Sequence, residues 1–458
     1  MSLTQLKKPQ NISLQEQTKQ SVFVETYGCQ MNVYDTELIK TILKKDNFKV
    51  VERMEDASVI MLNTCSVRDK ANRSIYNRVH TLKQIHPSPK GLKIGILGCM
   101  ATNFRKDLLE DRSINIDFIA GPDSYKSLPT LITQSYETQK RKKPFDVTLS
   151  EFETYEDVYP TRSEGVNAWI AIMRGCNNYC TFCVVPLTRG RERSRTITSV
   201  VDEVKRLVDD GFQQVTLLGQ NVNSYNSEQS NFTELMDAVS QVDGLKRIRF
   251  TSPHPKDFPI PLLELMAERS NICKQIHLPL QAGNSRVLEM MNRTYTKEGF
   301  LDIAAQIKTI IPNVALSTDI IVGFPTETPE EFEDTLDVVK QVEFDSAFMF
   351  NYSERKGTRA YHRFKDDIPA DEKTRRIVQL NDTQRAISLV KNQDHIGQTQ
   401  RILVEETKTK KSDGKIMGRL DNNKRVLFEP NSQPIQLGDW LDITITGATS
   451  NSLFGELN

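Results

Sequence analysis

The sequence of 458 residues lacks an excess of charge, because 60 lysines and arginines balance 60 aspartates and glutamates. A uniformly basic surface for nucleic acid is therefore excluded, and any RNA contact has to come from local patches. No apolar run approaches the roughly 20 residues of a membrane-spanning helix, so we expect no membrane partner. The first 20 residues lack an apolar core, which predicts a polar, disordered tail rather than a signal peptide.

Histidine is scarce, and none of the six lies between His86 and His254. Within that interval Cys176, Cys180 and Cys183 share one short loop, with no fourth cysteine or histidine beside them. A structural zinc site needs four such ligands, so it would have to be completed from a distant part of the chain. Three thiolates instead suit a [4Fe–4S] cluster whose fourth iron takes a ligand from outside the protein.

A second set of three cysteines is spread over the first hundred residues. Cys29, Cys65 and Cys99 each follow an apolar, β-rich run and precede a stretch that can start a helix. Loops after the carboxyl ends of parallel strands meet at one edge of a sheet, so we expect these thiols to meet in space. Six cysteines as thiolate ligands imply a reducing cytoplasm, and Cys273 is left as a semi-buried structural thiol.

The order of elements predicts an α/β protein of about three domains. Strands alternate with helices, such as one over 35–46, in an open, mainly parallel α/β domain. In the middle of the chain six strand–helix units predict a partial (β/α)6 barrel. The expected boundaries are 1–20 for the tail, 21–137 for the first domain, 138–161 for a charged linker, 162–393 for the barrel and 396–458 for the last domain.

The predicted barrel strands cover 168–173, 214–218, 247–251, 275–278, 315–322 and 346–351. Helices are expected over 200–210 and 329–342, the second starting with Thr328 as N-cap and proline at its first position. After Arg401 the pattern changes to short strands over 401–405, 415–419, 426–428 and 440–447, separated by turn residues. This predicts a small antiparallel β-barrel.

The phrases around the cysteines resemble a known family. TYGCQMN, NTCSVR and GCMA, followed by RGCNNYCTFCVVPLTRGRERSR, are similar to the methylthiotransferases of the radical S-adenosylmethionine (SAM) enzymes. The last phrase is most similar to the bacterial members that 2-methylthiolate N6-dimethylallyladenosine in tRNA. The resemblance extends from about Val22 onward. One departure is Asp35-Thr36-Glu37, where many relatives have serine in the middle, and both residues carry a hydroxyl.

The resemblance implies a methylthiotransferase domain, a radical SAM core and a C-terminal TRAM domain that binds RNA. It implies two [4Fe–4S] clusters and SAM, with the six cysteines as catalytic and metal-binding residues. The cluster on Cys176, Cys180 and Cys183 would cleave SAM to a 5′-deoxyadenosyl radical that abstracts hydrogen from carbon 2 of the adenine at position 37. The auxiliary cluster on the other three cysteines would hold a sulfur that accepts a methyl group from another SAM.

Polar residues at the expected strand ends become candidate SAM contacts, because the loops after barrel strands build active sites. Each of these side chains is about as often a satisfied core group as a ligand contact. The candidates are Phe182, Gln220, Asn221, His277, Gln281, Thr318, Asp319 and Gly323.

Two basic stretches are candidate RNA contacts, since arginine and lysine bind phosphate. One follows the cluster loop and the other lies in the last domain: Arg189, Arg191, Arg193, Arg195, Lys408, Lys410, Lys411, Lys415, Arg419, Lys424 and Arg425. The expected partners are the tRNA anticodon stem-loop, an electron donor such as flavodoxin or ferredoxin, and a sulfur donor. The alternatives are a sister enzyme acting on threonylcarbamoyl-adenosine tRNA or a ribosomal-protein aspartate, and a non-catalytic zinc protein that binds RNA.

Overall fold

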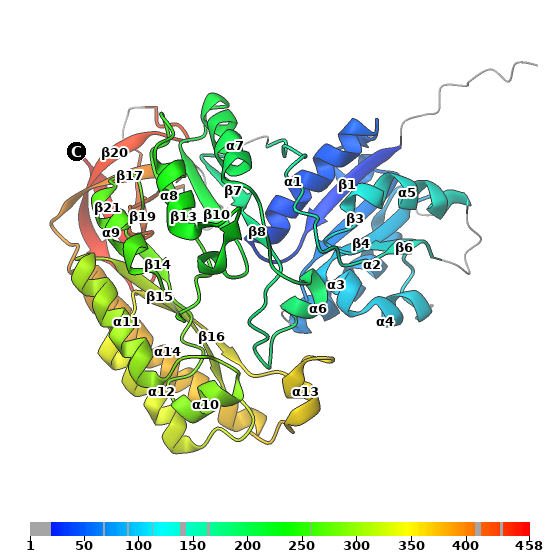
Figure 1. Ribbon diagram of the computed structural model, residues 1–458. Coiled ribbons are helices and arrows are strands. Elements are labelled where there is room, and N and C mark those ends of the chain that lie inside the picture. The colour runs from blue at the N-terminus through cyan, green and yellow to red at the C-terminus, as the bar shows by residue number, and fades with distance from the viewer. Residues whose placement is uncertain are drawn as a thin grey trace, which may run out of the picture.

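The computed structural model describes residues 20–458 except 67–68, 89–90, 112, 138–142, 163–164, 257, 408–413 and 431–433. The predicted tail therefore lies almost entirely outside the described residues. Figure 1 shows the N-terminal domain in blue and cyan, the central domain in green and yellow, and the C-terminal barrel in red. Of the helices in the described part of the chain, none combines the length and the apolar character that a bilayer crossing requires.

The N-terminal domain has the predicted open α/β architecture with a parallel sheet, which contains six strands in the described part of the chain. Its strands lie in the order β2-β1-β3-β4-β5-β6. They are β1 (Ser21–Thr26), β2 (Lys49–Val50), β3 (Val59–Thr64), β4 (Lys93–Gly98), β5 (Phe118–Ala120) and β6 (Phe145–Asp146). The helices are α1 (Gln30–Lys45), η1 (Met54–Asp56), α2 (Asp69–Ile85), α3 (Cys99–Asn103), α4 (Arg105–Glu110), η2 (Tyr125–Ser127) and α5 (Leu128–Glu137).

Two details of this domain differ from the expectation. Helix α1 begins at Gln30 rather than Asp35, because the extended backbone of Cys29 already forms its N-cap. The expected linker is partly structured: β6 adds a sixth strand, and Tyr155 is fully buried in the domain core. Hydrophobic periodicity in the sequence detects neither the exact start of α1 nor the strand β6. A strand of two residues is too short to show a period.

The central domain contains the six predicted strands as two three-stranded parallel sheets, β13-β10-β7 and β14-β15-β16. A single parallel bridge between Ile248 and Ile272 connects the two, so the barrel is open. The strands are β7 (Asn167–Ala171), β8 (Met173–Arg174), β9 (Arg193–Ser194), β10 (Gln214–Leu218), β11 (Asn226–Ser227), β12 (Ser230–Asn231), β13 (Arg247–Phe250), β14 (Gln275–His277), β15 (Ala315–Val322) and β16 (Ser346–Asn351).

Helices cover the outside of the barrel, and their apolar faces form the largest core of the molecule. The helices of the central domain are α6 (Val185–Arg189), α7 (Ile197–Asp209), η3 (Val222–Ser224), α8 (Phe232–Ser240), α9 (Ile260–Glu268), α10 (Ser285–Met290), α11 (Lys297–Ile310), α12 (Pro329–Val342), α13 (Arg359–Arg363) and α14 (Ala370–Gln393). Helix α12 has the bounds predicted from Thr328, whose hydroxyl accepts from the Glu331 amide in a capping box.

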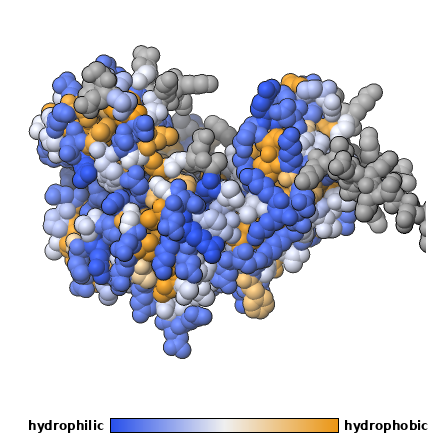
Figure 2. All heavy atoms as spheres, turned by 90° about the horizontal axis from the view of Figure 1, so that it is seen from above, coloured by the Kyte–Doolittle hydropathy of each residue, from blue (hydrophilic) through white to orange (hydrophobic). Residues whose placement is uncertain are grey.

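The C-terminal domain is a closed five-stranded barrel in the order β17-β18-β19-β21-β20. Its strands are β17 (Thr399–Glu406), β18 (Ile416–Arg419), β19 (Arg425–Phe428), β20 (Trp440–Ala448) and β21 (Leu453–Leu457). Four were predicted, and β21, which closes the barrel, was missed. Seen from above in Figure 2, the molecule forms two lobes with a hollow between them, and the lobe that carries the N-terminal domain lies beside the barrel.

Candidate active site

The three cysteines of the N-terminal domain meet at one sheet edge, as their positions after strands predicted. Cys29 follows β1, Cys65 follows β3 and Cys99 opens α3 after β4, and these three strands are neighbours in the sheet. A hydrogen bond with the Cys65 side chain is the main cause that lowers the pKa of the Cys29 thiol to about 6. Burial raises the pKa of Cys99. We call these three residues the auxiliary triad.

Buried amides hold the strand ends beneath the auxiliary triad. Asn32 donates to the Asn63 side chain and to the Thr64 carbonyl at 3.3 and 3.2 Å, and Asn63 donates back to the Asn32 carbonyl at 2.9 Å. Gly28 has a φ of +141°, and a Cβ there would lie 2.7 Å from the Cys65 Cβ. Only glycine therefore allows the backbone to pass this close to the thiols.

The other three cysteines lie on the loop between β8 and α6, at the rim of the barrel. Gly175, with a φ of +79°, turns the chain, and the Cys176 amide donates to the Gly190 carbonyl at 3.2 Å. The Thr181 amide donates to the Met291 carbonyl at 2.9 Å, which ties the loop to the barrel. Burial raises the pKa of Cys176 to about 11 and that of Cys183 to about 12. We call these cysteines the loop triad.

A buried arginine lies against the loop triad. Arg293 donates to the Cys180 sulfur at 3.3 Å, to the Tyr295 hydroxyl at 3.1 Å and to the Pro279 carbonyl at 3.3 Å. It forms no ion pair with a carboxylate among the described residues, so its charge faces the thiols. Arg293 was not among the predicted site residues, because a single arginine between two helices has no distinctive spacing.

The chemistry of both triads fits an iron–sulfur cluster. Each offers three thiols, and no three Cys, His, Asp or Glu side chains in the described ranges are gathered as ligands of one metal ion. Three thiolates can each bind a different iron of a four-iron cluster.

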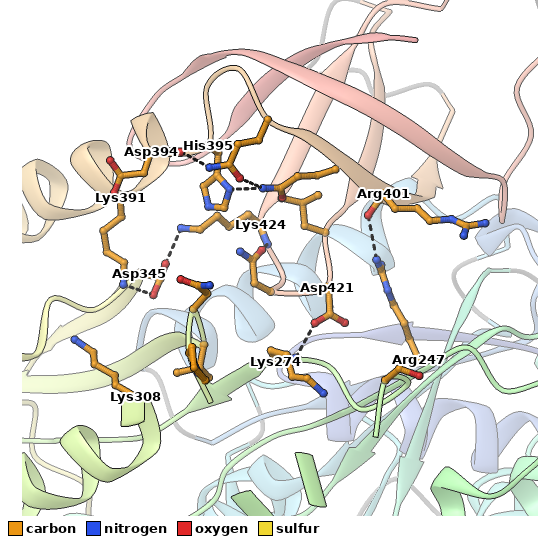
Figure 3. A pocket seen from close by; sticks show the side chains of 18 of the residues that line it. Arg247, Lys274, Lys308, Asp345, Lys391, Asp394, His395, Arg401, Asp421 and Lys424 are labelled. Carbon is orange, nitrogen blue, oxygen red and sulfur yellow. Dashed lines mark hydrogen bonds and ion pairs between the residues drawn. The ribbon is translucent and has the colours of Figure 1, made fainter. Parts of the chain in front are cut away.

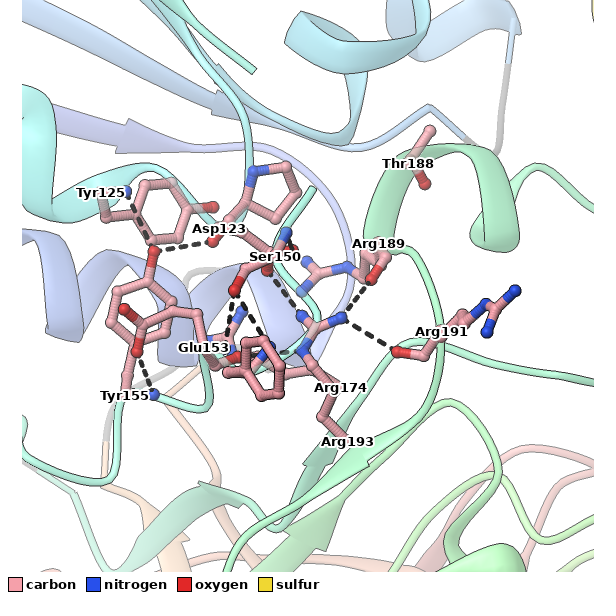
Figure 4. Close-up of polar contacts among 12 residues, drawn as sticks. Asp123, Tyr125, Ser150, Glu153, Tyr155, Arg174, Thr188, Arg189, Arg191 and Arg193 are labelled. Carbon is pink, nitrogen blue, oxygen red and sulfur yellow. Dashed lines mark hydrogen bonds and ion pairs between the residues drawn. The ribbon is translucent and has the colours of Figure 1, made fainter. Parts of the chain in front are cut away.

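Carboxylates of the N-terminal domain connect the triads by binding arginines on both sides of the cluster loop. Asp35 accepts from Arg174 at 2.7 Å and from Arg189 at 2.8 Å, and Asp123 accepts from Arg193 at 2.8 Å. Figure 4 shows Arg189 and Arg193 pointing toward Asp123 and the Tyr125–Tyr155 pair. Burial disfavours the charge on Asp35, but the two guanidinium groups hold its pKa below the ordinary value.

This arrangement corrects the RNA assignment of three arginines. Arg189 and Arg193 are buried in the domain interface, and Arg195 is buried in an ion pair with Glu203. Their guanidinium groups are not available to phosphate in this conformation. Arg191 alone of this stretch is exposed, and its RNA contact stays a prediction.

The candidate SAM contacts lie at the strand ends on the same rim. The amide oxygens of Gln220 and Asn221 are buried without a hydrogen-bond donor among the described residues, as expected for groups that face a ligand. His277 lies 3.3 Å from Asp319 and shares a hydrogen bond with Ser317. The oxygens of Gln220 and Asn221 therefore remain available for a ligand contact, whereas both ring nitrogens of His277 already face protein groups.

Other SAM candidates already have protein partners. The Thr318 hydroxyl accepts from the Leu280 amide at 2.9 Å, and the Gly323 amide donates to Glu327 at 2.6 Å. The Gln281 amide donates to the Asp319 carbonyl, and Phe182 packs against the small core around Phe324. No contact in the structure tests their assignment to SAM.

The turn between β18 and β19 docks the C-terminal barrel on the other end of the central barrel. Arg249 donates to the carbonyls of Leu420 and Asp421 at 2.8 and 2.9 Å, and the Lys274 amide donates to the Asp421 carboxylate at 2.9 Å. Cys273 was predicted to be semi-buried, but it is buried at this junction, and burial raises its pKa to about 12. The domain thus packs tightly against the catalytic core.

A cavity of about 820 Å³ opens beside this junction (Figure 3). Basic residues outnumber acidic ones in its lining, which includes Lys246, Arg247, Lys274, Lys308, Lys391, Arg401 and Lys424 against Asp345, Asp394 and Asp421. Several of these cations have protein partners: Lys391 and Lys424 share Asp345, and Arg247 lies over the Trp440 ring. The lining is nevertheless a positively charged surface in a chain without net charge.

The RNA candidates of the C-terminal barrel fall into three groups. Lys408, Lys410 and Lys411 lie outside the described residues. Arg419 and Lys424 form ion pairs with Glu405 and Asp345, and Lys415 lies 3.7 Å from Glu429 and over the Phe454 ring. Arg425 is exposed.

Family models match three parts of the chain. Residues 170–339 match the radical SAM superfamily, residues 393–457 match the TRAM domain, and residues 21–121 match a family described as uncharacterized protein family UPF0004. The matches coincide with the barrel, the small β-barrel and the N-terminal sheet.

Curated relatives cover almost the whole chain. A protein of Chloroherpeton thalassium named tRNA-2-methylthio-N(6)-dimethylallyladenosine synthase is 46% identical over 439 residues, which are 95% of this chain and 96% of that protein. A protein of the same name from Parabacteroides distasonis is 43% identical over 450 residues and covers 97% of both chains.

Solved structures share the fold at low identity. The radical SAM methyltransferase TsrM from Kitasatospora setae, bound to cobalamin and a [4Fe–4S] cluster, matches with a TM-score of 0.57 and 15% identity, covering 75% of this chain and 77% of that one. The cobalamin-dependent radical enzyme OxsB matches with a TM-score of 0.52 and 12% identity, covering 80% and 56%. Both confirm the architecture of the barrel and its neighbouring α/β domain.

Proposed function

The chain belongs to the family of tRNA-2-methylthio-N(6)-dimethylallyladenosine synthases, and we propose that it transfers a methylthio group to carbon 2 of N6-dimethylallyladenosine at position 37 of tRNA. The relatives that support this proposal are more than 40% identical over nearly the full chain. The observation that carries it is the presence of two cysteine triads, one in each of two domains, joined by a buried interface.

The reaction needs radical chemistry, because the C–H bond at carbon 2 of adenine does not yield to acid–base side chains. A four-iron cluster together with SAM supplies that chemistry when bound, and protein side chains orient it. The loop triad and the strand ends near Gln220 and Asn221 would hold cluster and SAM at the barrel rim. A second cluster on the auxiliary triad is part of our proposal.

The residues of this chain fix the geometry between the two triads. Helix α3, which carries Cys99, packs against α6, which directly follows the loop triad. Asp35, paired with Arg174 and Arg189, fixes this contact with a buried charge network. The N-terminal domain therefore sits at the rim where the target base has to enter.

Because the proposed substrate is a tRNA, we also propose which parts of the chain bind it and which other partners the reaction needs. The TRAM domain and the exposed Arg191 and Arg425 would bind the anticodon stem-loop, whose unpaired bases can be splayed out for modification at low cost. An electron donor such as flavodoxin or ferredoxin and a separate sulfur donor complete the proposed system. The domain division given from the sequence, with a TRAM domain over 396–458, also remains a proposal.

Reaction of a short RNA tests the substrate. An anticodon stem-loop with dimethylallyladenosine should be methylthiolated by the anaerobically reconstituted enzyme, as read by nucleoside mass analysis. A site built for the prenyl group gains about 0.8 kcal/mol for each buried CH₂, so unmodified adenosine should react at least about a hundredfold more slowly. Equal turnover of unmodified RNA, threonylcarbamoylated RNA or a ribosomal-protein peptide would contradict the assignment.

A further inference from the structure

The cavity beside the C-terminal junction lies at the end of the central barrel that is opposite to the active-site rim. The central domain lines it with residues that begin or immediately precede four strands: Lys246 and Arg247 at β13, Lys274 at β14, Val314 at β15 and Asp345 at β16. Its other wall comes from the end of α14 and from the C-terminal barrel, so the cavity spans two domains (Figure 3). Both triads, by contrast, follow the carboxyl ends of strands, so a ligand in this cavity would not touch the reacting atoms.

The lining of the cavity carries an excess of positive charge. Seven lysines and arginines face three aspartates, which leaves an excess of four positive charges. Asp345 is already shared by Lys391 and Lys424, at 2.7 Å each, and Asp421 accepts from the Lys274 amide. Five of the seven cations have no carboxylate partner in the part of the chain that the structure describes: Lys246, Arg247, Lys274, Lys308 and Arg401.

Uncharged groups hold three of these cations in place. The Lys308 ammonium group donates to the Val342 carbonyl, and that of Lys274 donates to main-chain carbonyls. Arg247 lies over the Trp440 ring, 4.6 Å from its centroid. Carbonyls and rings orient a cation but do not cancel its charge, and burial lowers the pKa of Lys274, Lys308 and Arg247. The cavity is therefore a place where an anion would be stabilised.

We propose that this cavity binds the phosphate chain of a nucleoside triphosphate, with inorganic pyrophosphate as a smaller ligand of the same chemistry. A triphosphate carries about four negative charges at neutral pH, which matches the excess in the lining. Lysine and arginine bind phosphate through charge-assisted hydrogen bonds. The volume of about 820 Å³ lies within the roughly 300–1,000 Å³ of small-molecule sites. Such a ligand would hold the C-terminal barrel on the catalytic core, and the proposal is independent of the proposed reaction.

The fluorescence of Trp440 reports on the cavity. Trp440 lines it, and Trp169 is the only other tryptophan of the chain, so Trp169→Phe leaves a single emitting indole. The full chain, reconstituted anaerobically, is titrated with adenosine triphosphate or sodium pyrophosphate in separate arms, at constant ionic strength and without divalent cations. We expect a saturable change of the Trp440 emission with either probe. The thermal midpoint of the unaltered chain should also rise with probe concentration, because only the folded state contains the site.

Lys308→Gln tests the site by removing one charge from its lining. It should raise the Kd for both probes by at least about tenfold, the size of a lost charged hydrogen bond. Lys340→Gln is the matched control, because Lys340 is an exposed lysine of α12 outside the cavity. It removes the same charge from the chain and should leave both Kd values within about twofold of the parent.

Four results would overturn the proposal. The first is an absence of saturation, in fluorescence and in the thermal midpoint, up to about 10 mM of either probe. The second is an unchanged Kd in Lys308→Gln, or an equal loss in Lys308→Gln and Lys340→Gln. The third is sulfate binding as tightly as pyrophosphate, which would indicate general attraction of anions. The fourth is displacement of both probes by an anticodon stem-loop whose own affinity depends equally on Lys308, since the phosphates would then belong to RNA.

Discussion

The loop triad and the auxiliary triad offer the same three thiols but are built in opposite ways. The loop triad lies within eight residues, so one turn at Gly175 and a few backbone hydrogen bonds fix it. The auxiliary triad gathers residues 70 positions apart at the ends of three neighbouring parallel strands. Local spacing therefore defines the first site, whereas sheet topology defines the second.

The two sites also share a feature that neither motif shows. A buried arginine from the central domain lies beside each: Arg293 contacts Cys180, and Arg189 lies beside Cys99 and Cys29. Positive charge near an iron–sulfur cluster, together with hydrogen bonds to its sulfurs, adjusts the reduction potential. The difference is that Arg293 stays within its own domain, while Arg189 crosses an interface.

The largest effect should come from removing each triad separately. Replacing Cys176, Cys180 and Cys183 by alanine should leave about half the iron and abolish 5′-deoxyadenosine formation, because SAM binding and its cleavage need the same cluster. Replacing Cys29, Cys65 and Cys99 should also halve the iron but spare that cleavage. Iron analysis measures the cluster content, and chromatography of 5′-deoxyadenosine measures the cleavage of SAM. Equal loss of cleavage in both triple variants would contradict separate roles for the two triads.

Asp35→Asn should break the connection between the triads. It leaves Arg174 and Arg189 buried without a counter-charge, and loss of one partner of a buried ion pair costs about 3–5 kcal/mol. The urea midpoint should fall accordingly. Asp157→Asn, at a carboxylate that is 64% exposed and pairs with Lys126, should change stability by less than about 1 kcal/mol. Similar midpoints for the two variants would show that the interface charge is unimportant.

Two glycine-to-alanine substitutions, each of which adds one methyl group, should each impair one of the two triads. In Gly28→Ala the new Cβ meets the Cys65 side chain, and in Gly175→Ala it meets the Arg191 carbonyl at 2.0 Å. Both positions have a positive φ, which costs a non-glycine residue about 1–3 kcal/mol before the clash. We expect Gly28→Ala to lose auxiliary iron and Gly175→Ala to lose SAM cleavage. Gly91→Ala, with open space around it, serves as the control.

Glu37 should make the interface sensitive to pH. Burial raises its pKa to about 7, with Arg162 opposing and Glu203 reinforcing the shift. The folded state therefore favours the neutral carboxyl of Glu37. This carboxyl contributes its full stabilisation when the pH is below its ordinary pKa. The contribution is lost as the pH rises to about 7. In the unaltered chain this carboxyl should lower the unfolding free energy by about 2 kcal/mol between about pH 5 and pH 7. Glu37→Gln lacks the titrating group, so its unfolding free energy should change by that much less over the same range. An unchanged pH profile of the urea midpoint would contradict this.

The smallest expected effect is on tRNA binding. It distinguishes Arg425, which is exposed, from Lys424, which forms an ion pair. Arg425→Gln should lower the salt dependence of tRNA binding by about one phosphate contact, since Arg425 is exposed. Lys424→Gln, which removes an ion pair with Asp345, should change stability more than RNA affinity. Identical salt slopes for Arg425→Gln and the unaltered chain would remove Arg425 from the interface. Point variants are preferable to removing the domain, because its turn is docked on Arg249.

The sequence by itself determined the two cysteine sets, the order of the domains and most strands. The spacing of cysteines and the alternation of strands and helices are local patterns. They can therefore be recognised in the sequence without knowledge of the tertiary structure. The bounds of α12 followed from Thr328 and the proline after it, because a helix N-terminus is satisfied by residues within one turn.

Only the tertiary structure decided what the arginines after the cluster loop do. In the sequence, Arg189, Arg193 and Arg195 have the spacing of an exposed basic strip, and the RNA assignment followed from that pattern. Their partners Asp35, Asp123 and Glu203 lie 154, 70 and 8 residues away. A charge shows in the sequence, but its counter-charge depends on which surfaces the fold buries together.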